Sequence, residues 1–117
     1  MPPEMYPSPT SEPSLKRREL APEISAAFHA LSQKVFAEGA LSAKAKQLIA
    51  VAVAHVTQCP YCIKGHTKAA LRHGASGGEL MEAIWVAAEM RAGGAYAHSI
   101  LAIEEMENEN AATPKSA

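Results

Sequence analysis

The sequence has few cysteines, few aromatic residues and no long apolar run. Its 117 residues include two Cys, two Phe, one Trp and three Tyr. No stretch approaches the roughly 20 consecutive apolar residues that a membrane-spanning helix needs, so no membrane partner is expected. The residues Met1 to Glu4 have neither the basic nor the apolar part of a secretion signal. A cytoplasmic location is therefore expected.

An excess of charge of one sign is also missing. The chain has 11 basic and 12 acidic residues, which give a formal net charge of −1. Binding to nucleic acid requires clustered basic residues. The longest such cluster is Lys16-Arg17-Arg18, which we interpret as a solvated surface. No nucleic-acid partner is expected.

The alternation of apolar and polar residues that is typical of strands does not occur over any length. Apolar residues make up 48% of the chain, and much of this share is alanine at helical spacing. The pattern predicts an all-α, single-domain helical fold of about five helices. Because alanine buries little area and the chain is short, we expect a homo-oligomer that completes its apolar burial between subunits.

Composition divides the chain into three parts. Residues 1–14 contain five prolines and are predicted to form a disordered tail. Residues 15–107 are predicted to form the helical domain. Residues 108–117 are predicted to be a flexible C-terminal tail.

Capping and breaking residues predict where the helices begin and end. Pro22 suits the first turn of a helix that extends to about Gly39, and Ser42 suits the N-cap of the next. That second helix should break near residues 56–58, because Pro60 cannot continue it. A third helix is predicted from Pro60 to about residue 73, with Gly74 as its left-handed cap. A fourth is predicted from residue 76, and residues 93–94, both glycine, should separate it from a fifth.

Several large apolar residues fall on one face of these helices. We expect Met81 and Trp85 to lie in the core or in a subunit interface. The first helix carries an apolar stripe at helical spacing, which consists of Ile24, Phe28, Leu31 and Val35.

The two cysteines lie three residues apart, in Cys59-Pro60-Tyr61-Cys62. A structural disulfide is not expected in the cytosol, which leaves redox chemistry or metal binding. With Pro60 as the first helical residue, Cys59 is the expected cap and Cys62 lies in the first turn. The start of a helix stabilises a thiolate, and residues three apart share a face, so a disulfide between them can form and break.

His66 lies one turn beyond Cys62 on the same face, where an imidazole can accept the thiol proton. Two accessory candidates flank this group. Tyr61 either contacts the substrate or covers the disulfide. His55 either interacts with the carbonyl end of its helix or serves as a second relay group.

Zinc binding is the competing hypothesis, because His55, Cys59, Cys62 and His66 are all good ligands. In one continuous helix the two histidines would lie roughly 16 Å apart, too far for one coordination shell. Three ligands, Cys59, Cys62 and His66, remain as an alternative. Zinc is the weaker hypothesis, and we expect neither a metal nor a cofactor.

Five segments together resemble a known family: Lys46-Gln47-Leu48-Ile49-Ala50, the Cys59–Cys62 motif, His66-Thr67-Lys68-Ala69-Ala70, Gly74 and Glu79-Leu80. They resemble the alkylhydroperoxidase D-like proteins of the carboxymuconolactone decarboxylase family, over roughly residues 36 to 103. The resemblance implies a trimeric or hexameric helical protein that reduces peroxides with a cysteine pair. Its partners would be a peroxide substrate and a disulfide-reducing electron donor.

The resemblance also implies a role for each site residue. Cys62 would be the peroxidatic cysteine, Cys59 the resolving one and His66 part of the proton relay. The family's relay includes a glutamate where this chain has Gln47. If the two helices form an antiparallel pair turning near Gln58, residue 47 lies opposite His66 to Lys68. Because glutamine neither accepts a proton nor carries charge, we expect a weaker peroxidase.

Two other functions use the same residues. A redox sensor or disulfide carrier would cycle Cys59 and Cys62 without peroxide turnover. A zinc-stabilised helical binding module would use the cysteines as ligands.

Overall fold

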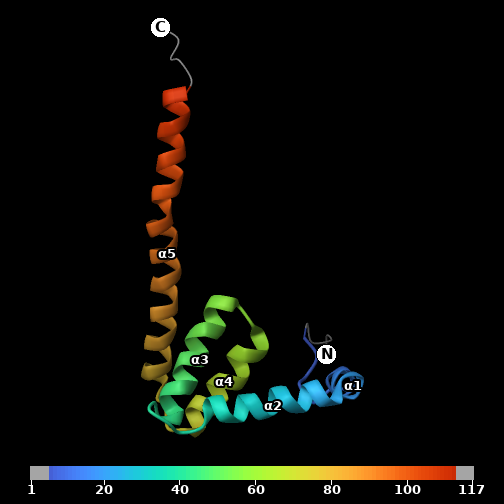
Figure 1. The fold of residues 1–117 in the computed structure, drawn as a ribbon. Coiled ribbons are helices and arrows are strands. Elements are labelled where there is room, and N and C mark those ends of the chain that lie inside the picture. Colours follow the sequence, from blue (N-terminus) through green and yellow to red (C-terminus); the bar gives the residue numbers. More distant parts are fainter. Residues whose placement is uncertain (1–5, 113–117) are drawn as a thin grey trace, which may run out of the picture.

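Five helices and no strand make up residues 6–112, the part of the chain that the computed structural model describes (Figure 1). The all-α prediction is confirmed. The helices are α1 (Glu12–Leu20), α2 (Pro22–Phe36), α3 (Ala43–Thr57), α4 (Pro60–Arg72) and α5 (Gly77–Ala112).

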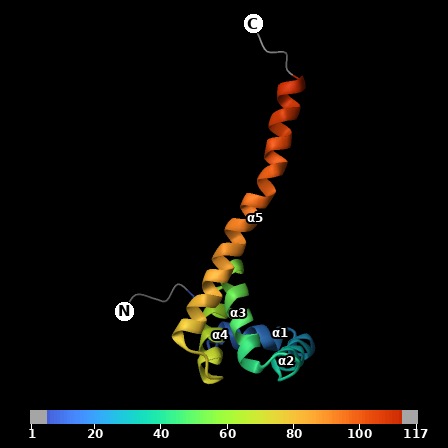
Figure 2. The same ribbon diagram turned by 90° about the vertical axis from the view of Figure 1, so that its left-hand side faces the viewer.

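Helix α3 is the centre of the fold. It packs against both α4 and α5, whereas α2 and α1 lead away from this group (Figures 1 and 2). The core lies where the three helices meet, and Leu48 and Ile84 pack against it. Its buried members are Val51, Ala70, Ala75 and Leu80. The core is small because most of its side chains are small.

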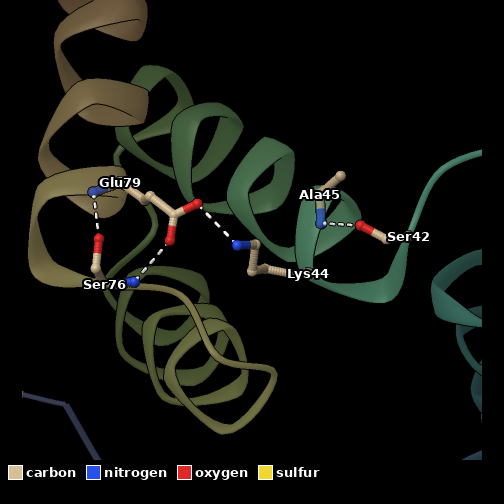
Figure 3. A network of polar contacts seen from close by, with 5 residues as sticks. All are labelled: Ser42, Lys44, Ala45, Ser76 and Glu79. Carbon is tan, nitrogen blue, oxygen red and sulfur yellow. Dashed lines mark hydrogen bonds and ion pairs between the residues drawn. The ribbon is translucent and has the colours of Figure 1, made fainter.

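Polar caps fix the start of α3 and of α5 (Figure 3). The Ser42 hydroxyl accepts the Ala45 N–H at 3.0 Å, as predicted for an N-cap. At α5, Ser76 and Glu79 form a reciprocal capping box, with bonds of 2.9 and 3.0 Å. Glu79 also pairs with Lys44 of α3 at 2.9 Å, so the two helix starts are joined by charge.

The end of α4 also follows the prediction. The helix ends at Arg72, and Gly74 has a φ of 92°. Its N–H donates to the Leu71 carbonyl at 3.0 Å. Glycine adopts this left-handed conformation without steric cost, and it turns the chain back toward α5.

The predicted break at Gly93-Gly94 is wrong, because α5 continues unbroken from Gly77 to Ala112. A glycine inside a helix costs about 1 kcal/mol relative to alanine, but it keeps its N–H and does not clash as proline does. The surrounding alanine-rich sequence favours the helix strongly enough to offset two such residues. The number of helices matches the prediction, but the helices are not the same ones. The predicted fourth and fifth helices form one helix, α5, and α1 was not predicted.

Both predicted tail boundaries are exceeded by helix. Helix α1 begins at Glu12, inside the segment predicted to be disordered, and α5 ends at Ala112, beyond residue 107. Helix α1 has Pro13 in its first turn and Arg17 and Arg18 in its last, which suits the helix dipole. The predictions for residues 1–5 and 113–117 concern parts of the chain outside the described residues.

Much apolar surface stays exposed in the single chain. The α2 stripe of Ile24, Phe28, Leu31 and Val35 is 49 to 74% exposed. Met81 and Trp85 are 50% and 67% exposed, so they lie outside the core of the subunit. From residue 95 to its end, α5 is exposed all round. Among the described residues, none of the helices is both long and apolar enough to cross a membrane.

Candidate functional site

The turn between α3 and α4 places the two cysteines. Gln58 adopts the left-handed conformation, with φ 57° and ψ 46°, and its N–H donates to the Ala54 carbonyl. The Cys59 N–H donates to the same carbonyl at 3.1 Å. This C-cap ends α3 within the predicted range, residues 56–58, and α4 then packs back along α3.

Cys59 caps α4, as expected from Pro60 at the first helical position. Its sulfur accepts the Cys62 N–H at 3.3 Å. The two Sγ atoms lie 2.8 Å apart, and both cysteines are free and half-buried. A disulfide bond is about 2.05 Å long, so two-electron oxidation of the pair would require only a small approach of the two sulfurs.

The two thiols differ in acidity. Hydrogen bonds from the Cys62 thiol and the Cys62 N–H lower the pKa of Cys59. The hydrogen bond to Cys59, burial and the charge on Cys59 raise the pKa of Cys62. The first ionisation of the pair therefore leaves a thiolate on Cys59 and a thiol on Cys62, which donates to it.

Gln47 and His66 are in contact, as expected for an antiparallel α3–α4 pair. The Gln47 Oε1 atom lies 2.7 Å from His66 Nδ1, and Gln47 is only 6% exposed. Because a carbonyl oxygen only accepts hydrogen bonds, Nδ1 carries the hydrogen in this arrangement. The Nε2 atom then keeps its lone pair and can accept a proton.

Cys62 and His66 both line an apolar cavity of about 410 Å³. The ring of Phe36, at the end of α2, stacks on the His66 imidazole with centroids 5.0 Å apart. Apolar residues of α2 and α3 form most of the wall, including Val35, Ile49, Ala50 and Val53. Lys46 is the one cation among the described residues that line the cavity, and its Nζ donates to the Ala37 carbonyl at 2.7 Å.

No direct hydrogen bond joins Cys62 to His66 within residues 6–112. Both line the same cavity, so a substrate bound there can contact both residues. The arrangement supplies a thiol, a proton acceptor and an apolar space for a substrate.

The accessory candidates lie outside this cavity. His55 Nδ1 is bonded to the Val51 carbonyl of its own helix at 2.7 Å. The ring of Tyr61 meets the edge of Tyr6, with centroids 5.8 Å apart. Neither residue lines the cavity that holds Cys62 and His66.

The four potential zinc ligands do not converge. Within the described part of the chain, no three His, Cys, Asp or Glu side chains are grouped closely enough to hold a metal ion. Because Nδ1 of His55 and of His66 is already hydrogen-bonded, each ring has one nitrogen left for a ligand role. The arrangement of these residues gives the zinc hypothesis no support.

Sequence reasoning missed Phe36 and Lys46 as site residues. Phe36 follows the predicted apolar stripe directly, but only the path of the chain after α2 brings it to His66. Lys46 directly precedes Gln47 in the sequence. The predicted contact between Gln47 and His66 indicated that this part of α3 lies near the site.

Comparison with known sequences gives a consistent family. The model of the carboxymuconolactone decarboxylase family matches residues 22–105. A Paracoccus denitrificans protein described as uncharacterized protein 4 in cox locus is 70% identical over 76 residues, which cover 65% of this chain and 68% of that protein. An uncharacterized protein of Cupriavidus necator is 38% identical over 72 residues, or 62% of this chain and 64% of that protein.

Two solved structures share the fold. A Methanobacterium thermoautotrophicum protein has a TM-score of 0.67 and 37% identity, covering 71% of this chain and 93% of its own. A carboxymuconolactone decarboxylase family protein from Legionella pneumophila has a TM-score of 0.63 and 35% identity, covering 80% of this chain and 84% of its own. The family match spans α2 to α4 and most of α5. This chain belongs to the carboxymuconolactone decarboxylase family.

Proposed function

We propose that this protein is a thiol peroxidase that reduces organic hydroperoxides through Cys59 and Cys62. One observation carries the proposal: the sulfurs lie 2.8 Å apart at the start of α4, and Cys62 shares an apolar cavity with His66. A thiol pair of this kind stores the two electrons that a hydroperoxide consumes.

Cys62 is the proposed peroxidatic cysteine, because it lines the cavity and Cys59 does not. Its thiolate attacks the distal peroxide oxygen, the O–O bond breaks and Cys62 becomes a sulfenic acid. The alkoxide takes a proton and leaves as an alcohol. Cys59 then attacks the Cys62 sulfur, which forms the disulfide and releases water. Two equivalents of a thiol donor restore both cysteines.

His66 is the proposed proton acceptor and donor. Its Nε2 atom takes the proton of Cys62 before attack and returns it to the departing alkoxide. Gln47 holds the ring through Nδ1, and Phe36 holds its plane by stacking. The raised pKa of Cys62 favours such a relay, because the thiol ionises less readily than an ordinary cysteine.

The cavity favours organic substrates over hydrogen peroxide. Its walls are mainly aliphatic and aromatic, so burying an alkyl group there is favourable, whereas a small polar peroxide gains little. Cytoplasmic reductants would keep the pair reduced between turnovers.

Counting thiols by mass spectrometry tests the proposal directly. The wild type, treated with one equivalent of cumene hydroperoxide, should lose two hydrogens as the Cys59–Cys62 disulfide forms. Cys62→Ser should show no such loss, and Cys59→Ser should accumulate a sulfenic acid on Cys62. Two unchanged thiols in the wild type would contradict the proposal.

A disulfide carrier without peroxide turnover is the second candidate. The lowered pKa of Cys59 favours it, because the first cysteine of such motifs is commonly the attacking thiolate in disulfide exchange. Rapid exchange with protein disulfides, together with no reaction toward hydroperoxides, would identify a carrier.

We further propose that the working unit is a homo-oligomer, a trimer or a hexamer. The radius of gyration of the single chain is 21.4 Å, against about 13 Å for a compact domain of 100 residues. The exposed α2 stripe and the part of α5 from residue 95 onward have apolar surface that another copy can cover.

A further inference from the structure

A second concave site opens beside Cys59. It is a groove of about 550 Å³ between the start of the chain and the cysteine motif. Cys59 and Tyr61 line it, whereas Cys62 and His66 do not. The apolar cavity shows the reverse pattern, since it is lined by Cys62 and not by Cys59. The two sulfurs therefore face two different sites.

The lining of the groove includes serine hydroxyls and one positive charge. Arg17 of α1 lines it and donates from Nη2 to the Ser14 hydroxyl at 3.3 Å. Ser14 is only 8% exposed. Ser11 is another lining residue, and its hydroxyl oxygen is buried with no hydrogen-bond partner among residues 6–112. Within residues 6–112, no carboxylate lies within 4.0 Å of the Arg17 guanidinium.

The walls of this groove come largely from outside the family domain. The family match begins at residue 22, whereas the groove uses residues 7–17. Tyr6 meets the ring of Tyr61 edge to face and so holds this segment against the motif. Residues outside the family match thus lie next to Cys59, and they supply a cation.

We propose that this groove binds the reductant, a small thiol that carries a carboxylate. The proposal rests on the redox role of the cysteine pair given above. The carboxylate would pair with the Arg17 guanidinium, which has no carboxylate partner within residues 6–112. The thiol of the donor would then reach Cys59, the cysteine exposed in the groove.

The reaction balances with two donor molecules. The first donor loses its proton and attacks Cys59 Sγ, and the Cys59–Cys62 bond breaks with its electron pair on Cys62. Cys62 takes up one proton. A second donor thiolate attacks the donor sulfur of the mixed disulfide and releases Cys59, which takes up the second proton. The donor leaves as its own disulfide, so it is oxidised while the protein is reduced.

The test starts from protein that diamide has oxidised, so it does not depend on peroxide turnover. The rate of disulfide reduction is measured with 3-mercaptopropionate and with its neutral analogue 3-mercaptopropionamide, in wild type, Arg17→Met and Arg18→Met. Arg18 is the matched control, because it neighbours Arg17 on α1 and does not line the groove.

Arg17→Met should lower the rate with the acid about fivefold and leave the rate with the amide unchanged. The Arg18→Met rates should match wild type for both thiols, and added salt should weaken the preference of the wild type for the acid. Peptide mapping of the trapped mixed disulfide should locate it on Cys59.

Equal effects of the two arginine substitutions, or a mixed disulfide on Cys62, would overturn the proposal. A protein that diamide oxidises but hydroperoxides do not would contradict the peroxidase function and leave the groove assignment standing. Failure of diamide to form the disulfide would overturn both.

Discussion

Gln47 holds the imidazole of His66 without giving it a charged partner. Its amide oxygen is 2.7 Å from Nδ1, so the ring orientation and the hydrogen on Nδ1 are fixed by a neutral group. A carboxylate at the same place would also stabilise the imidazolium that forms when His66 accepts the thiol proton. With glutamine at position 47, the His66 ring is oriented but is not activated by a neighbouring negative charge.

We predict that Gln47→Glu raises peroxide turnover about tenfold, which corresponds to about 1.4 kcal/mol of imidazolium stabilisation. Steady-state kinetics with cumene hydroperoxide and an excess of thiol donor would measure it. Gln47→Leu, which removes the hydrogen bond without adding charge, should lower turnover. Equal turnover in all three proteins would show that residue 47 does not act through His66.

The acidity of the two thiols can be read from their alkylation. Since the pKa of Cys59 is lowered and that of Cys62 is raised, Cys59 should react with iodoacetamide faster than Cys62 at about pH 7. As the pH rises, Cys59 reaches its full rate first, and Cys62 reacts appreciably only above the usual cysteine pKa of about 8.5. Peptide mapping after partial alkylation measures both profiles. Faster labelling of Cys62 near neutral pH would contradict this order.

At the scale of the helix, α3 depends on its cap. The hydroxyl of Ser42 satisfies the Ala45 N–H, so Ser42→Ala should lower the free energy of unfolding by about 1 kcal/mol. Urea unfolding followed by circular dichroism gives this value. Ser42→Asp keeps an acceptor and should restore most of the stability. If Asp is no better than Ala, the cap does not contribute.

Helices with local start and stop signals were predictable from the sequence. The cap at Ser42, the break before Pro60 and the turn at Gly74 were all expected, and each depends on one residue's own stereochemistry. The contact between Gln47 and His66 also followed, because an antiparallel pair with a known turn fixes which residues face each other.

Other features depend on competing energies or on distant contacts, which capping and breaking residues do not reveal. Helix α1 lacks an apolar stripe, so periodicity gave no sign of it, although its charges suit the helix dipole. The glycines of α5 reduce helix propensity without ending the helix. The place of Phe36 on the His66 ring depends on the loop after α2, and the acidity order of the cysteines depends on hydrogen bonds at α4.

At the scale of the whole molecule, the exposed stripe of α2 predicts self-association. Phe28→Glu places a charge in the stripe and should lower the molar mass measured by light scattering, while Gln33→Glu, on the polar side of α2, should not. The wild type is expected at three or six times the 12.4 kDa of one chain. A monomeric wild type would contradict the proposed oligomer.

One face of α3 serves two purposes. Gln47, Val51 and Ala54 are all buried and recur at helical spacing, so the residue that orients His66 lies in line with the residues that pack the core. A substitution on this face that alters the reactivity of His66 also disturbs the core. A substitution that repacks the core also shifts Gln47 and therefore His66. Substitutions on this face should therefore change peroxide reactivity and the free energy of unfolding together. Substitutions of Phe36 and Lys46, which lie outside that face, should change the reactivity with less effect on stability.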